Sequence, residues 1–241
     1  MTKVAIFDTE TTGFDPKTEQ VIESAYIELV DLPPSHLGVI DIASCDTNMR
    51  RYRPDVPIQF GAQAVHHILA EDLEGCPHPS TLSLPVDLDY IIGHNIDFDC
   101  SHIGNPDFKR ICTLAISRYM FPDLDSHNQS AMLYYIARLY GIESVVREAL
   151  KNAHCAGDDV INCARLLRFL VKEALANGML KEDSWEALYE FSELARIPTV
   201  MGFGKHKGDK IRDVPRSYVQ WYRRQDETDP YYIKAFNMAG L

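Results

Sequence analysis

Residues 3–13 read KVAIFDTETTG, an apolar and β-branched run that ends in two acidic residues and a Thr-Thr-Gly turn. Such a run predicts a buried strand from Lys3 to Asp8, with a turn at Gly13. Residues two apart on a strand share a face and lie about 7 Å apart. Asp8 and Glu10 are therefore expected to project together, and two buried anions side by side are costly without a cation between them. This stretch predicts a metal site at the end of a core strand.

The apolar strand, and not the D-x-E spacing, carries this prediction. Asp72 and Glu74 have the same spacing, but they lie on a predicted polar helix face. For that pair, solvated surface charge is the better interpretation.

The rest of the sequence predicts that this strand belongs to an α/β fold. Further strands are expected at residues 21–30, 38–44, 90–92 and 110–112, and helices at residues 62–73, 114–120, 130–140, 158–176 and 181–195. Strands first, then strands alternating with helices, predict a mixed sheet with helices packed on it. Asn177-Gly178 is expected to end the long helix, and a Gly/Lys-rich turn at residues 201–208 opens a compact tail.

Composition narrows the class of protein. The chain has 241 residues, of which 46% are hydrophobic and 24% charged, as in ordinary soluble proteins. No apolar run reaches the length of a membrane span, and no signal-type segment precedes the first strand. The six cysteines form no C-x-x-C pair, which excludes zinc ribbons and thioredoxin-type sites. We expect a cytoplasmic protein that does not enter membranes.

The net charge of −11 is unevenly distributed. Residues 196–241 hold nine Lys/Arg and five Asp/Glu, a balance of 9 − 5 = +4, so residues 1–195 hold −11 − 4 = −15. An acidic body with a basic tail is compatible with a carboxylate-rich metal site plus a nucleic-acid-binding appendage. It is equally compatible with an ordinary solubilising surface, and charge alone does not separate the two.

A second acidic segment, residues 93–99 (GHNIDFD), follows the predicted strand at 90–92. Ligand sites of α/β sheets gather at the carboxyl ends of strands. Asp97 and Asp99 both qualify as site residues here, and either one also suits a cap of the following turn.

The third segment is residues 154–159 (HCAGDD). Helical steps from Asp159 reach an apolar row at Cys163, Leu166 and Leu170. The same steps from Asp158 reach Asn162, Arg165 and Lys172, a polar row expected to face solvent. Asp159 is therefore the expected inward carboxylate, and His154 is expected on the loop before the helix.

These segments bring together oxygen ligands and one histidine. All-oxygen ligands suit Mg²⁺ or Mn²⁺ rather than zinc. Two such ions activate water and stabilise the leaving oxygen of a phosphodiester. A histidine that titrates near neutral pH can take the proton from that water.

In order and spacing the three segments resemble the motifs of the DEDDh superfamily of 3′→5′ exonucleases. The resemblance spans roughly residues 3–175 and is highly specific in combination. It implies an RNase H-like, mixed five-stranded sheet flanked by helices, two Mg²⁺ or Mn²⁺ ions, and release of nucleoside monophosphates. It also implies that Asp99, which directly follows the aromatic Phe98, is the site residue rather than Asp97. The implied catalytic set is Asp8, Glu10, Asp99, His154 and Asp159, with the four carboxylates holding metal.

The resemblance also implies substrate contacts. Thr11 and Thr12 fall where the family's backbone approaches the terminal nucleotide, although both also suit turn formation before Gly13. His66 belongs to a further segment that resembles the family, at residues 64–68, and Asn95 belongs to the second of the three motifs. Both are expected to contact substrate.

The tail from residue 203 resembles the small C-terminal module of exonuclease X-like proteins. Lys205 and Lys207 lie in its glycine turn and are expected to bind phosphate, with simple solvation as an equal alternative. Tyr218, Trp221 and Tyr222 are expected to form the core of the module. We therefore expect an exonuclease domain at residues 1–178, a helical linker at 179–197 and the module at 198–241.

Together these features predict a DNA exonuclease of the repair or replication type, acting on single-stranded DNA or on 3′ ends of duplex DNA. An RNA 3′-exonuclease remains an alternative, because the same site can cut either polymer. A second alternative is a proofreading or binding subunit of a larger nucleic-acid complex. A homodimer or a replication or repair protein partner also remains open.

Overall fold

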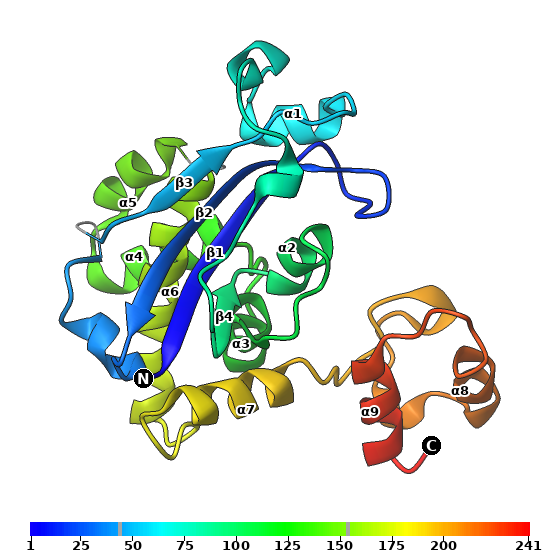
Figure 1. The fold of residues 1–241 in the computed structure, drawn as a ribbon. Helices are drawn as coiled ribbons and strands as arrows, with labels where there is room; N and C mark the ends of the chain where they lie inside the picture. Colours follow the sequence, from blue (N-terminus) through cyan, green and yellow to red (C-terminus); the bar gives the residue numbers. More distant parts are fainter. Residues whose placement is uncertain (43–44, 153–154) are drawn as a thin grey trace. The chain divides into compact units, whose positions relative to one another are not determined.

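The computed structural model describes residues 1–42, 45–152 and 155–241. Within these residues five strands form one mixed sheet of order β3-β2-β1-β4-β5 (Figure 1). The strands are β1 (Lys3–Thr11), β2 (Val21–Val30), β3 (Asn48–Arg51), β4 (Tyr90–Gly93) and β5 (Lys109–Cys112). β1 runs antiparallel to β2 and parallel to β4, and β4 runs parallel to β5. The expected mixed five-stranded sheet is confirmed.

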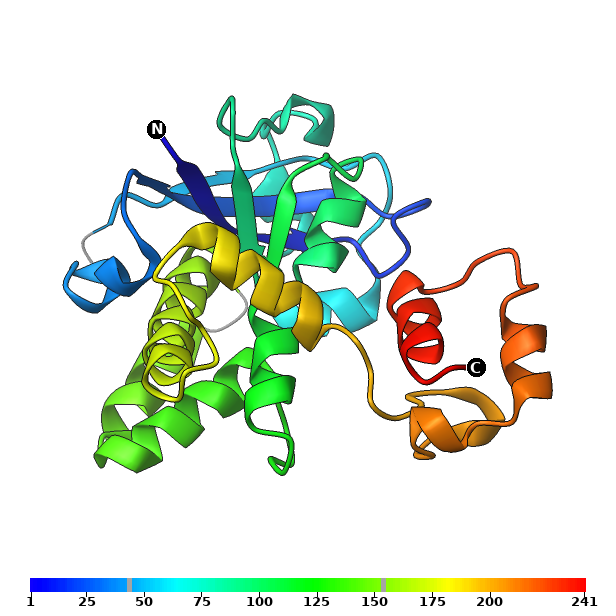
Figure 2. The same ribbon diagram turned by 90° about the horizontal axis from the view of Figure 1, so that it is seen from below.

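The described residues also form nine α-helices. They are α1 (Phe60–His66), α2 (Ile96–His102), α3 (Thr113–Met120), α4 (Gln129–Tyr140), α5 (Glu143–Ala149), α6 (Ala156–Ala176), α7 (Trp185–Ala195), α8 (Arg216–Tyr222) and α9 (Pro230–Met238). The central helix, α6, packs across β1 and β2 and contacts α3 and α4 (Figures 1 and 2). Its apolar row of Cys163, Leu166 and Leu170 is buried, as its helical phase predicts.

Two expected elements near the sheet edge are wrong. The strand expected at residues 38–44 is wrong for residues 38–42, which are not strand, while residues 43–44 lie outside the described residues. Gly38 ends a 3₁₀ turn (Pro34–Gly38), and Leu37 of that turn is buried where the turn contacts α6. The edge strand is instead β3, which has no alternating apolar pattern to reveal it. The helix expected at 62–73 is broken after His66, because His67 adopts a left-handed conformation (φ 58°) and a separate 3₁₀ turn follows at Ala70–Leu73.

The chain divides into two compact units, Met1–Ser192 and Glu193–Leu241. The division falls near the end of α7, inside the segment expected as a helical linker. Trp185, Leu188 and Phe191 of α7 are buried, and the Ser192 hydroxyl accepts the backbone N–H of Cys112 on β5 at 2.9 Å. Most of α7 therefore packs as part of the first unit.

The second unit has a hydrophobic core of its own. Seven buried residues form it: Met201, Ile211, Val214, Val219, Tyr222, Ala235 and Phe236. Tyr222 is a core residue as expected, but Trp221 is 50% exposed, so the expectation that it belongs to the core is wrong. Across the described parts of both units, no helix is long and apolar enough to cross a membrane.

Candidate active site

Three carboxylates converge where the carboxyl half of β1 meets the start of α6. One ligand oxygen each from Asp8, Glu10 and Asp159 lie within 4.8 Å of one another. β1 supplies the first two because alternate strand residues share a face. α6 supplies the third from its first turn, where the positive end of the helix dipole favours an anion. Such a set of hard oxygen donors fits a divalent metal cation.

Asp99 comes to the same edge of the sheet from a different direction. β4 runs parallel to β1, so the helix that follows it, α2, begins beside the carboxyl end of β1. The backbone N–H and the hydroxyl of Thr9 both donate to Asp99 Oδ1, at 2.9 Å and 2.7 Å. Asp99 is thus buried and fixed to the residue between Asp8 and Glu10.

Asp97 and Asp99 lie in different environments. Asp97 lies about half exposed and forms an ion pair with Arg110 on β5, at 3.3 Å. Asp99 is 3% exposed. α2 produces this difference, because residues two apart on a helix point in very different directions.

Gly93 permits the close approach of β4 and β1 at this edge. A Cβ atom at Gly93 would lie 2.9 Å from the backbone oxygen of Phe7 and 2.9 Å from the Ile96 side chain. Real side chains essentially never make contacts this short, so only glycine lets α2 begin this close to β1.

The carboxylates have strongly perturbed acidity. Burial, together with the charges of Asp99, Asp159, Glu10 and Glu23, raises the pKa of Asp8 well above its ordinary value. Burial also raises the pKa of Glu10 to about 9, with Asp159, Glu23 and Asp99 adding to the effect. The pKa of Asp99 rises to about 7 through burial, although the hydrogen bonds from Thr9 oppose the rise. Without a cation, the cluster resists full ionisation near neutral pH.

Glu23 is a fifth acidic residue, beside the four carboxylates of the site, that the sequence prediction does not include. It lies opposite Glu10 in the β1–β2 register and is 0% exposed. Its carboxylate accepts the side-chain N–H of Arg51 at 2.7 Å and the backbone N–H of Ala156 at 2.9 Å. Glu23 therefore ties the first residue of α6 to β2. The available signal was an acidic residue that directly follows the apolar Val21 and Ile22 of a predicted strand.

Gln129 at the start of α4 is a second missed residue. Its amide donates to the Asp159 carboxylate and to the Asp159 backbone oxygen, both at 3.1 Å. This pair of bonds joins the start of α4 to the first turn of α6 and holds Asp159 in place.

The other expected site residues lie in several environments. Thr11 donates its hydroxyl to the Gly13 carbonyl at 2.7 Å, and Thr12 donates to Glu19 at 2.6 Å, so both hold the turn after β1. His66 is buried and its Nδ1 accepts the Ile68 N–H at 2.9 Å. Asn95 is exposed, in a left-handed conformation just before α2. Each of their substrate contacts stays a prediction.

His154 lies outside the described residues. Lys205 and Lys207 belong to the second unit, where both are exposed. Asp158, the neighbour of Asp159, is partly exposed. Asn162 on the polar row of α6 is 1% exposed, so its expected position on the solvent face is wrong. It accepts a hydrogen bond from Arg165 at 3.0 Å.

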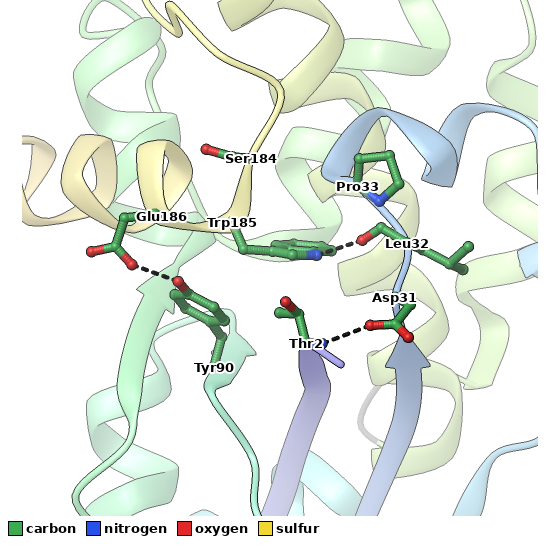
Figure 3. A pocket seen from close by; sticks show the side chains of 8 residues that line it. All are labelled: Thr2, Asp31, Leu32, Pro33, Tyr90, Ser184, Trp185 and Glu186. Carbon is green, nitrogen blue, oxygen red and sulfur yellow. Dashed lines mark hydrogen bonds between the residues drawn. The ribbon is translucent and has the colours of Figure 1, made fainter.

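A pocket at the opposite end of β1 has a different character (Figure 3). Its polar groups satisfy one another: the Trp185 indole donates to the Leu32 carbonyl at 2.6 Å, and the Tyr90 hydroxyl donates to Glu186 at 2.5 Å (Figure 3). These bonds anchor the start of α7 to the ends of β2 and β4. The pocket therefore serves the packing of α7 and has no cluster of metal-ligating side chains.

The sheet and its acidic edge define the class of the protein, a nuclease of the RNase H-like fold. The exonuclease family model matches residues 5–167, and the chain belongs to that family. A second family model, named for a quorum-sensing-regulated virulence factor, matches residues 190–228. The expectation of a DEDDh exonuclease that resembles exonuclease X is confirmed by these relatives and those that follow.

Two curated relatives are similar in sequence. Exodeoxyribonuclease 10 of Escherichia coli K12 is 23% identical over 236 residues, which cover 93% of each chain. The PolC-type DNA polymerase III of Clostridium perfringens is 27% identical over 184 residues, which cover 70% of this chain and 11% of that one.

Two solved structures share the fold. Exonuclease X in complex with 5′-overhanging duplex DNA has a TM-score of 0.51 at 21% identity, covering 77% of this chain and 99% of that chain. Exonuclease I of E. coli in complex with a dT13 oligonucleotide has a TM-score of 0.52 at 16% identity, covering 74% of this chain and 43% of that chain.

Proposed function

We propose that this chain is a metal-dependent exonuclease that hydrolyses the terminal phosphodiester at 3′ ends of DNA and releases nucleoside monophosphates. The observation that carries the proposal is the convergence of Asp8, Glu10 and Asp159 within 4.8 Å, with Asp99 held beside them by Thr9. The names of the relatives support DNA as the polymer, since exodeoxyribonuclease 10 matches over nearly its whole length.

Two Mg²⁺ or Mn²⁺ ions are the proposed cofactors. Asp8, Glu10, Asp99 and Asp159 would hold them, and bound ions would supply an activated water and charge stabilisation for the leaving oxygen. Thr9 and Gln129 keep Asp99 and Asp159 in place for this task. We assign to His154, which precedes α6, the removal of a proton from the attacking water.

An aromatic pair beside Asp99 supports a polynucleotide substrate. The ring of Phe98, next to Asp99 on α2, lies edge-on to Phe14 with 6.2 Å between ring centroids. Phe14 is 75% exposed on the turn after β1, so its ring is open to a ligand. Bases stack on exposed aromatic rings with little regard to sequence. We propose that this pair packs against the terminal bases.

A degradation assay tests the proposal. Single-stranded DNA, duplex DNA and RNA, each labelled at the 5′ end, are incubated with Mg²⁺ in the presence and absence of a chelator. We expect chelator-sensitive shortening from the 3′ end of DNA. Asp8→Asn and Asp99→Asn should abolish it, while the matched Asp97→Asn should retain it, because Asp97 pairs with Arg110 away from the cluster.

The outcomes separate the alternatives. Undiminished cleavage by Asp8→Asn would refute the assigned site. Shortening of RNA but not of DNA would retain the site and replace the proposed polymer. Release of internal fragments would refute the exonucleolytic direction.

A further inference from the structure

On the second unit, Glu193–Leu241, an exposed tryptophan extends a row of aromatic side chains whose Tyr218 packs against the core. On α8 the rings of Tyr218 and Trp221 lie 5.1 Å apart between centroids, and the imidazole of His206 lies 4.7 Å from the Tyr218 ring. We call these three side chains the aromatic ladder. Its outermost member, Trp221, is 50% exposed, whereas the neighbouring Tyr222 is buried in the core.

The ladder is held in shape by its surroundings. Gly204 has a positive φ of 68°, and a Cβ atom there would lie 2.4 Å from the Tyr218 hydroxyl, so the 204–206 turn is pressed against the tyrosine. The Asp209 carboxylate lies 2.8 Å from His206 Nδ1 and orients the imidazole. An exposed tryptophan on such a fixed support is a typical feature of a binding surface.

Positive charge flanks the ladder. Lys205 and Lys207 stand on either side of His206, and Lys210 follows at the end of the same turn. All three are exposed, and among the described residues none of them has an ion-pair partner. Arg216 and Arg223 differ, because they donate to the Gly240 and Leu241 carbonyls and so hold the chain end.

The charge balance of the unit agrees with an anionic ligand. Residues 193–241 hold nine Lys/Arg and six Asp/Glu, which gives 9 − 6 = +3, whereas residues 1–192 hold −11 − 3 = −14. Of the acidic side chains near the turn, Asp209 contacts His206 and Asp213 contacts Arg212.

We propose that the second unit binds a single-stranded polynucleotide, with bases stacked on Trp221 and Tyr218 and phosphates on Lys205 and Lys207. Aromatic rings flanked by lysines combine the two features that single strands require, a stacking platform and a positive backbone contact. Bases within a duplex are already stacked on one another, so they are not free to stack on the aromatic ladder. The choice of polymer rests on the proposed function of the first unit, but the binding does not require that unit to be active.

Tethered binding has a consequence for the nuclease. Holding the strand through one unit raises its effective concentration at any second site on the same chain. We therefore expect the second unit to lower the KM for long strands and to leave that for very short ones unchanged.

The test uses the full chain and its intrinsic fluorescence. The chain has two tryptophans, and Trp185 is 5% exposed with its indole N–H bonded to Leu32, so base stacking should quench Trp221 alone. The Asp8→Asn variant in chelator is titrated with dT20 and with an abasic 20-mer of equal charge. Binding is followed in parallel by anisotropy of labelled dT20.

Matched variants test the separate contributions of the aromatic rings and of the lysines to binding. Trp221→Phe should lose the quench yet keep most of the affinity, whereas Trp221→Ala should bind about tenfold more weakly, as expected for a lost stacking partner. Lys205→Ala combined with Lys207→Ala should reduce the slope of log affinity against log salt by about 1.4, since each single-strand phosphate contact contributes roughly 0.7. The control Lys234→Ala, an exposed lysine on α9, should change the affinity and the slope little.

Three results would overturn the proposal: a quench that persists in Trp221→Phe, equal affinity for dT20 and the abasic strand, or equal affinity for polyglutamate at the same salt. Failure of the proposed function would look different. In that case the binding results would hold while the chain with native Asp8 failed to shorten DNA with Mg²⁺ present. Circular dichroism of each variant confirms that the helices are intact.

Discussion

Replacing Glu10 by glutamine should stabilise the metal-free protein while removing its activity. Glu10 is a buried acid on β1, surrounded by Asp8, Asp159, Asp99 and Glu23. Glutamine has nearly the same shape but carries no charge. The change therefore removes the cost of keeping this carboxyl protonated in the folded cluster above its ordinary pKa, and it leaves the packing of the strand intact.

The magnitude follows from the pKa of Glu10, which burial and its acidic neighbours raise from an ordinary value of 4.5 to about 9. Below about pH 4.5 the folded and unfolded chains both hold the proton, and the carboxyl has no effect. Above that pH the unfolded chain releases the proton while the folded chain keeps it, so stability falls as pH rises towards 9. At pH 7, about 2.5 pH units above the ordinary value, the cost is about 3 kcal/mol.

Urea unfolding in chelator at pH 5, 6, 7 and 8 measures this difference. We expect the advantage of Glu10→Gln over the native protein to grow with pH and to reach about 3 kcal/mol at pH 7. Added Mg²⁺ should reverse the order, because a cation that binds only the folded chain stabilises it by mass action and the variant lacks one ligand. Glu74→Gln, from the exposed Asp72–Glu74 pair, is the control and should show neither effect. A variant less stable than the native protein at every pH would refute this reasoning.

Three further substitutions probe the supports of the site. Glu23→Ala leaves the Ala156 N–H without its acceptor and Arg51 without its partner, and should lower the free energy of unfolding by about 2 kcal/mol; urea unfolding checks this, and an unchanged midpoint would contradict it. Gly93→Ala forces a Cβ atom against the Phe7 carbonyl and should destabilise by about 2 kcal/mol. The matched Gly61→Ala, in open space on α1, should not destabilise. Phe14→Ala should raise KM for DNA several-fold with little change in melting temperature, and a large loss of stability would show that the exposed ring is structural.

The sequence alone was sufficient to predict the elements whose apolar residues face the core. β1 and β4 are apolar runs bounded by residues that end strands, and α6 has an apolar row at helical spacing. The local sequence pattern is therefore sufficient to predict their burial. β3 has the sequence NMRR and lies at the sheet edge, where three of its four residues are exposed. An exposed edge strand is specified by its pairing with β2 and not by its own residues, so the more apolar residues 38–42 are predicted as a strand in its place.

The candidate site shows the same division between local and tertiary information. The two acids of β1 and the inward phase of Asp159 are local properties of a strand and a helix. Glu23 is different: the strand at residues 21–30 is predicted, but its first half is buried on both faces, so alternation does not indicate which of its polar residues faces the site. Asn162 was misplaced for a related reason: α6 is buried around more of its circumference than one apolar row indicates.

The strongest constraint on the cluster comes from neutral and cationic hydrogen-bond donors, which the spacing of the acidic residues does not specify. Thr9 fixes Asp99, Gln129 fixes Asp159, and the backbone of α6 is fixed through Glu23 to Arg51. Each donor sits on a different element, so the acids are aligned by the packing of β2, α2, α4 and α6 around β1. D-x-E spacing recurs at Asp72 and Glu74 without any of these donors. A metal site therefore requires the donors as well as the acids, because like charges brought together without them would repel one another and separate.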